Sequence, residues 1–317
     1  MTAEFADEAV AQKAAEQAAS KSQSEPGDAP TLAQVVTHWP WLAAISVSVV
    51  LIVLNYFRSD LFSYWWNKWM EKDSYYSHGV LIPFISAFAV YLDRRTLAKM
   101  PVSPSFLGLI FLAPAALVAL VAHTADTPSI LGLSLPAVIF GAAWLLLGTA
   151  IAWRLVFPIW FLSFMCVLPG FVLTTMSFKI QLLSTSGAAL ILRIIGLHPE
   201  QHGAAIKLAN AEVLVGQPCS GFRLLISLLA FAIFFAYMRE GPRWGKLVLV
   251  ISTAPLSLFV NSVRIFMIAL VGEFFGNEAM HAFHDYSGYL VLVLAFAVLW
   301  QLSKVVKCEK FKAVLIS

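Results

Sequence analysis

Long runs of apolar residues alternate with short polar segments along most of this chain. Several runs reach roughly 17 residues or more, about the length of an α-helix that crosses the hydrocarbon core of a bilayer. We therefore predict an all-α, multi-pass integral membrane helical bundle of about eight transmembrane helices. The predicted spans are residues 41–57, 79–92, 106–122, 129–150, 156–172, 222–238, 247–271 and 286–303.

The two ends of the chain differ from its apolar centre. Residues 1–30 consist mostly of Ala, Glu, Gln, Lys, Ser and Asp, too polar to bury a core, and are predicted to form a disordered cytoplasmic tail. A cleavable signal peptide would need its apolar region nearer the N-terminus, so the first span is expected to be retained. Residues 31–303 are predicted to form the transmembrane domain, and residues 304–317 a basic cytoplasmic tail.

Two segments have the pattern of helices that lie on the membrane. Residues 58–78 are amphipathic and rich in Trp and Tyr, which collect at the headgroup level. Residues 176–195 are apolar enough to cross but contain Lys179, Gln181 and Arg193. Because one Arg at mid-membrane costs about 2.5–3.5 kcal/mol, we predict that this second segment is interfacial or re-entrant on the outer face.

The distribution of Lys and Arg gives the orientation. Basic residues flank spans at Arg94, Arg95, Arg154, Arg239, Arg243 and Lys246, and again at the C-terminus, whereas the loop 123–128 has none. Short loops rich in Lys and Arg stay on the cytoplasmic side. Both termini are therefore expected inside, and the chain can cross only an odd number of times between Arg154 and Cys219. This parity also predicts that residues 176–195 do not span.

Composition agrees with the membrane assignment and excludes other classes. Hydrophobic residues make up 60% of the chain and charged residues 12%, with a mean hydropathy of +0.79. The net charge of +3 comes without a basic patch of interleaved aromatic residues, so nucleic acid is not an expected partner. We predict no metal site and no cofactor.

The three cysteines, Cys166, Cys219 and Cys308, are far apart and imply no disulfide framework. Cys166 is predicted to be a packing residue, and Cys308 a cytoplasmic thiol that an impermeant reagent reaches only after permeabilisation. Cys219 differs from both, because it is expected to face an oxidising compartment, where an idle thiol is a liability. Its position favours a functional role.

Cys219 lies where a polar loop, residues 196–217, meets the apolar run 222–238. We predict that it occupies the first helical turn, with Pro218 at the first helical position. The helix dipole and Arg223, four residues further on, would both favour the thiolate that a nucleophilic cysteine needs. The alternative is a small apolar cysteine packed at a helix end.

Two further polar residues are predicted at the depth of Cys219. At 1.5 Å per helical residue from the basic inner loops, Arg264 lies roughly 27 Å and Cys219 about 30 Å across the membrane. His284 lies in the adjacent outer loop, and Asn261 lies one turn before Arg264, where it could orient the guanidinium. The alternatives are that Arg264 extends to outer headgroups and that His284 is an ordinary interfacial residue. His281 competes for any role given to His284.

The motifs that contain these residues resemble those of a known family. The exosortase/archaeosortase family of membrane-embedded cysteine peptidases is similar in the motifs Cys219-Ser220-Gly221-x-Arg223, Asn261-Ser262-Val263-Arg264 and His284-x-x-Ser287-Gly288. Tyr76-Ser77-His78-Gly79 with Pro83, and the stretch from Phe157-Pro158 to Leu168-Pro169, also look like that family. The similarity covers most of residues 40–303.

The resemblance implies a cysteine endopeptidase with sortase-like transpeptidase activity, in which Cys219 is the nucleophile and Arg264 and His284 complete the site. Its expected partners are exported, membrane-anchored proteins that end in a Pro-Glu-Pro-type sorting signal. Cleavage is expected on the outer face of the bacterial inner membrane, for attachment to the surface or to an extracellular polymer. The acceptor is either water or an amine.

A rival class is a transporter or a lipid-linked sugar flippase. A transport path needs polar groups near the membrane midplane, whereas the charged residues within these spans are few and lie near the outer edge. A third possibility, an assembly factor without chemistry, would make Cys219 dispensable.

Overall fold

A computed structural model describes residues 56, 60–71, 74–216 and 220–311. The predicted disordered tail, the first predicted span except Tyr56, and Cys219 with Gln217 and Pro218 all lie outside the described residues.

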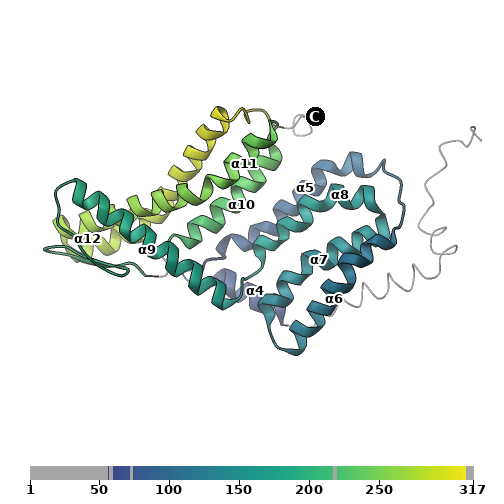
Figure 1. The fold of residues 1–317 in the computed structure, drawn as a ribbon, viewed down its shortest axis with the longest axis horizontal. Coiled ribbons are helices and arrows are strands. Elements are labelled where there is room, and N and C mark those ends of the chain that lie inside the picture. Colours follow the sequence, from purple (N-terminus) through teal and green to yellow (C-terminus); the bar gives the residue numbers. More distant parts are fainter. Residues whose placement is uncertain (1–55, 57–59, 72–73, 217–219, 312–317) are drawn as a thin grey trace, which may run out of the picture.

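The described part of the chain is built mainly of helices (Figure 1). The α-helices are α4 (Leu61–Met70), α5 (Ile82–Leu97), α6 (Leu109–Thr124), α7 (Pro128–Leu147), α8 (Thr149–Phe161), α9 (Gly170–Ile194), α10 (Phe222–Met238), α11 (Arg243–Ile251) and α12 (Thr253–Val305). Short 3-10 helices precede or follow them at η1 (Ser77–Leu81), η2 (Phe106–Gly108) and η3 (Leu162–Met165).

Several of these helices have the length and composition to cross a membrane. In the described ranges, 3 helical segments qualify, Phe106–Thr124, Pro128–Leu147 and Arg243–Val305, or up to 4 if the bent pair Thr149–Met165 and Gly170–Ile194 is one span. Phe222–Met238 is a shorter apolar helix. A multi-pass helical membrane protein is therefore supported, and the count of about eight spans stays a prediction.

α12 is too long to be a single crossing. Its 53 residues would extend about 80 Å, against about 30 Å for the hydrocarbon core. Gly276 interrupts it with φ 83° and ψ 178°, which are not helical values. The chain thus reverses at Gly276, and α12 consists of two helical halves, in agreement with the predicted spans 247–271 and 286–303 as separate units.

α9 is inclined by 82° to the helical segment Thr149–Met165 that precedes it. In Figure 1 it runs across the direction of α8 and α10. Such a bend accommodates either a broken span or a re-entrant helix, so the interfacial or re-entrant assignment of residues 176–195 stays a prediction. α9 packs closely on α12, because a Cβ on Gly187 would lie 2.4 Å from the Ser262 hydroxyl.

The segment predicted as a polar loop, residues 196–217, contains a small antiparallel sheet instead. Its strands are β1 (Glu200–His202), β2 (Ala205–Lys207) and β3 (Glu212–Leu214), in the order β1-β2-β3. Ile206 and Val213 face each other across the register and are buried against α9 and α12. The all-α prediction therefore missed a sheet whose strands are too short for period-two alternation to be visible.

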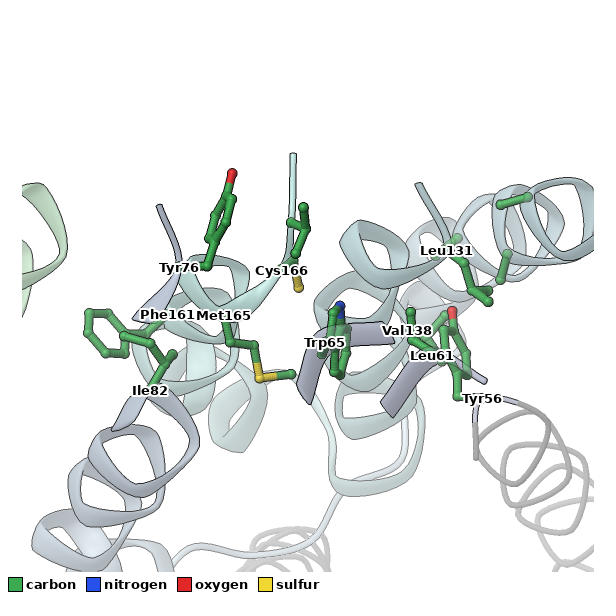
Figure 2. Packing of buried hydrophobic residues seen from close by; sticks show 14 of the residues in the cluster. Tyr56, Leu61, Trp65, Tyr76, Ile82, Leu131, Val138, Phe161, Met165 and Cys166 are labelled. Carbon is green, nitrogen blue, oxygen red and sulfur yellow. The ribbon is translucent and has the colours of Figure 1, made fainter. Parts of the chain in front are cut away.

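A large apolar cluster joins the first half of the fold (Figure 2). Trp65 and Trp69 stack with ring centroids 6.0 Å apart, and the Trp69 indole N–H donates to the Met165 carbonyl at 3.0 Å. The opposite face of α4 exposes Phe62 and Trp66. This two-sided pattern is that of an amphipathic helix anchored to the bundle, as the aromatic content of residues 58–78 indicated.

The basic residues predicted to be cytoplasmic gather at one end of the bundle. Arg154 lies 3.6 Å from Asp93, and the Arg239 guanidinium lies over the rings of Phe235, Trp300 and Phe311. The residues that follow α12 contact this end of the bundle, because the Glu240 N–H donates to the Lys310 carbonyl at 2.8 Å. The residues following α12 are thus folded onto the bundle as far as residue 311.

Candidate active site

The start of α10 is fixed by a glycine. Gly221 is the N-cap, with φ 78°, and a Cβ there would lie 2.8 Å from the Asn261 amide nitrogen. The helix therefore begins at Phe222, and the prediction that Pro218 is its first residue is wrong, because the left-handed Gly221 interrupts the helical path. Ser220 is fully buried, and its hydroxyl accepts from the Phe222 N–H at 3.3 Å.

Arg264 is held between the two halves of α12. Its Nε donates to the Ser287 hydroxyl at 3.0 Å, and its Nη2 donates to the His284 carbonyl at 3.1 Å. The Ser287 hydroxyl donates to the same carbonyl at 3.0 Å. These bonds leave further N–H donors of the guanidinium for an anion in the site.

Asn261 packs against the start of α10. Asn261 is 1% exposed and lies against Gly221, so it joins the first half of α12 to the start of α10. The hydrogen bonds described for Arg264 go to Ser287 and to the His284 carbonyl, and the orientation of Arg264 by Asn261 stays a prediction. Only one feature of the sequence pointed to Ser287 as a site residue, namely its position in the motif His284-x-x-Ser287-Gly288.

His284 has a carboxylate beside it. Its Nδ1 lies 3.3 Å from an Asp285 oxygen, and the side chains are 32% and 82% exposed, respectively. This contact favours the tautomer with the proton on Nδ1. His281 is exposed and does not line the cavity described next, which favours His284 over its competitor.

Four of the predicted site residues, Arg223, Asn261, Arg264 and His284, line one cavity of about 770 Å³ together with Gly221. The fifth, Cys219, lies outside the described residues, two positions before Gly221. A second cavity, of about 920 Å³ between α4 and α9, contains none of the four.

The walls of the first cavity change from polar to apolar along its length. Each helix of the wall contributes a row of side chains to the lining of the cavity. The polar side chains of these rows lie at one end: Ser77 and His78 before α5, Arg223 on α10, and His284 and Asp285 on α12. Except for Ser227 on α10, the deeper positions on the same helices are apolar: Ile82 and Ile85, Ala230, Phe231 and Phe234, and Val291, Leu292 and Phe296. The cavity suits a ligand that is polar at one end and apolar beyond it.

The arrangement has the components of acyl transfer. A guanidinium fixed by hydrogen bonds can stabilise an oxyanion, and an imidazole on the same wall can transfer protons. In the described part of the chain no group of three or more His, Cys, Asp or Glu side chains is placed to hold a metal ion.

Fold and cavity together define a helical membrane protein with a polar site at the end of an apolar cavity. The model of the transmembrane exosortase family matches residues 65–301, most of the chain. The chain therefore belongs to the transmembrane exosortase family, and the predicted resemblance is confirmed. Neither the curated proteins nor the solved structures gave a match.

Exosortases are a class of membrane cysteine peptidases and transpeptidases, so family membership supports a sortase-like processing role. Family membership by itself assigns no residue of this chain to a step of the reaction.

Proposed function

We propose that the protein is a cysteine endopeptidase with transpeptidase activity that cleaves exported proteins at a C-terminal Pro-Glu-Pro-type sorting signal. The reaction takes place at the outer face of the bacterial inner membrane. The observation that carries the proposal is the cavity in which Arg264 and His284 meet the start of α10, two residues after Cys219.

Cys219 begins the reaction. Its thiolate attacks the carbonyl carbon of the scissile peptide bond, and the carbonyl oxygen becomes an oxyanion. Arg264 stabilises this oxyanion through guanidinium donors not used by Ser287 and the His284 carbonyl. Because those two bonds fix the guanidinium before substrate arrives, it needs little reorganisation during the reaction.

His284 transfers the protons. It protonates the departing amine as the tetrahedral intermediate collapses to a thioester, and it then removes a proton from the acceptor that attacks the thioester. With the Nδ1 proton held beside Asp285, Nε2 is the atom that exchanges protons with the substrate. Water as acceptor gives hydrolysis, and an amine gives a new amide bond.

The cavity walls support a membrane-anchored substrate. A peptide that reaches Arg264 from the bilayer would lay its apolar residues along Ile85, Phe231 and Phe296. Apolar walls of this kind exclude water from the polar end, which strengthens electrostatic contacts there. Both features favour an exported protein with an apolar segment next to its cleavage site.

The test is processing of a tagged exported substrate in cells that express Cys219→Ala. We expect the unprocessed precursor to accumulate, with enzyme abundance unchanged on a blot. Cys166→Ala is the matched control, because that thiol is buried and donates to the Gly132 carbonyl outside the cavity. Normal processing by Cys219→Ala would refute the peptidase and favour a transporter or an assembly factor.

A further inference from the structure

A second polar position lies deeper in the same cavity. The stripe that α10 presents to it consists of Arg223, Leu224, Ser227, Ala230, Phe231 and Phe234. Ser227 stands among apolar neighbours, six residues after Gly221 and hence about 9 Å further along the helix. A hydroxyl in such a wall needs hydrogen-bond partners, because an unsatisfied polar group is costly there.

His78 is one partner of Ser227. Its Nδ1 lies 3.2 Å from the Ser227 hydroxyl oxygen, across a large separation in sequence. The imidazole stacks on Tyr76, with ring centroids 6.2 Å apart, and the Tyr76 hydroxyl accepts from the Leu168 N–H at 3.0 Å. His78 also lines the cavity. The ring is therefore held in place by its neighbours rather than by Ser227 alone.

The surroundings of His78 determine which atom of the pair donates. Burial disfavours a charged imidazole, so one ring nitrogen carries a proton and the other accepts. Nε2 is buried and has no well-aligned hydrogen bond in the described ranges, but the Phe164 carbonyl lies near the ring. Because Nδ1 faces the Ser227 hydroxyl at 3.2 Å, we assign the ring proton to Nε2. Nδ1 then accepts the Ser227 proton, and the Ser227 oxygen offers only acceptor lone pairs to the cavity.

We propose that Ser227, positioned by His78, binds a main-chain N–H of the substrate. Ser227 lies about 9 Å deeper than Gly221 at the start of α10, a distance that about three residues of an extended peptide cover. The bound residue lies on the C-terminal side of the scissile bond, where the substrate of the proposed reaction continues into the membrane. The inference rests on the proposed function for the identity of this substrate. It adds a contact that fixes the register of the peptide, so that the correct bond reaches the nucleophile.

The first experiment measures binding without chemistry. Full-length Cys219→Ala protein is reconstituted in lipid vesicles with a tagged exported protein that ends in the sorting signal, and the bound fraction is titrated. Adding Ser227→Ala should weaken binding about 3- to 10-fold, the effect of one neutral hydrogen bond. Ser227→Thr, which keeps the hydroxyl, should restore most of it. The matched control is Ser186→Ala, an exposed serine on α9 outside the cavity, which should leave binding unchanged.

The second experiment tests the pair. His78→Phe keeps a ring against Tyr76 but removes Nδ1, so it should weaken binding as much as Ser227→Ala, and the double variant should be no weaker than either single one. In enzyme with Cys219 intact, Ser227→Ala should raise KM by the same factor and change kcat less than about twofold.

Two results would overturn the inference. One is equal binding by Ser227→Ala and Ser186→Ala. The other is loss of protein abundance or thermal stability in His78→Phe without weaker binding, which would make His78 a brace between helices. Failure of the proposed function looks different, because processing would then survive Cys219→Ala while the binding titration still decides the role of Ser227.

Discussion

At the scale of single residues, the geometry around Arg264 separates catalysis from membrane anchoring. A residue that only extends to headgroups needs a long cationic side chain, which lysine also has. Arg264 instead uses two different nitrogens for Ser287 and the His284 carbonyl. Lysine has a single nitrogen and no planar fork, so it cannot make these bonds and also face an oxyanion with the same geometry.

Arg264→Lys is therefore expected to accumulate normally but to process substrate about 100- to 1,000-fold more slowly, the usual effect of losing an oxyanion donor. The measurement is the initial rate of substrate cleavage, normalised to membrane abundance. Arg193→Lys, at an exposed arginine in the last turn of α9, is the control and should process normally. Full activity of Arg264→Lys at normal abundance would return Arg264 to the anchoring role.

Gly221 gives a second prediction at this scale. Gly221→Ala places a Cβ 2.8 Å from the Asn261 amide and forces a side chain into φ 78°, at a cost of at least about 1 kcal/mol. We expect lower thermal stability and loss of processing, because the turn before α10 positions the segment that contains Cys219.

Gly170→Ala is the control for this prediction. A Cβ on Gly170 meets nothing within 4 Å, and its φ is not in the left-handed region. Stability and processing should be unchanged there. Equal behaviour of the two variants, both active and stable, would show that the Gly221 turn does not hold the site.

The sequence predicts which residues gather at the candidate site but not how they contact one another. Counting helical rise from the basic loops places Arg264 near the outer face, and His284 is predicted in the next outer loop; both line the cavity with Arg223 and Asn261. The Arg264–Ser287 bond joins the two halves of α12, and the His78–Ser227 contact joins segments 149 residues apart in the chain. Side-chain direction across such distances depends on helix rotation and packing, which a single sequence does not encode visibly.

At the scale of elements, strong apolar runs predict helices well, and irregular segments do not. The run 129–150 corresponds to α7, and 222–238 coincides with α10. The sheet over 196–217 was missed because each strand has only three residues and is stabilised by packing on α9 and α12 rather than by local preference. The reversal at Gly276 had one local signal, the glycine itself.

The prediction at the scale of elements concerns the side of the membrane on which the two ends of α9 lie. If α9 lies along the outer surface or is re-entrant, its two ends are on the same side of the membrane, so tags inserted after Gly170 and after His198 should both be accessible from outside. A tag after Met100, beside the basic loop that follows α5, should be accessible only after permeabilisation. Opposite sides for the first two tags would make α9 a span and change the span count.

At the scale of the whole molecule, the bundle has two chemically different ends. Asp93, Arg154 and the aromatic enclosure of Arg239 mark one, and the cavity with Arg264 and His284 marks the other. Basic residues remain on the cytoplasmic side of a membrane, so the polar end of the cavity is expected to open outward. This orientation is what an enzyme acting on exported proteins needs.

The cysteines test that orientation in one experiment. Cys166 is 1% exposed and Cys308 is fully buried, with its sulfur enclosed by the backbone at Gly241 and Gly245. Burial also raises the pKa of the Cys308 thiol, which lowers its thiolate fraction near neutral pH. Cys308 is thus not the accessible cytoplasmic thiol that the sequence indicated, and permeabilisation alone should not expose it.

A membrane-impermeant maleimide should therefore label the wild-type protein in spheroplasts, and Cys219→Ala should remain unlabelled both before and after permeabilisation. Denaturation in detergent should add the two buried thiols, which shows that both proteins are present and reduced. The readout is the mass shift per molecule on a gel. Labelling of wild type only after permeabilisation would place Cys219 inside and reverse the orientation. Labelling of Cys219→Ala in native membranes would instead show that Cys166 or Cys308 is accessible and that the packing around it opens.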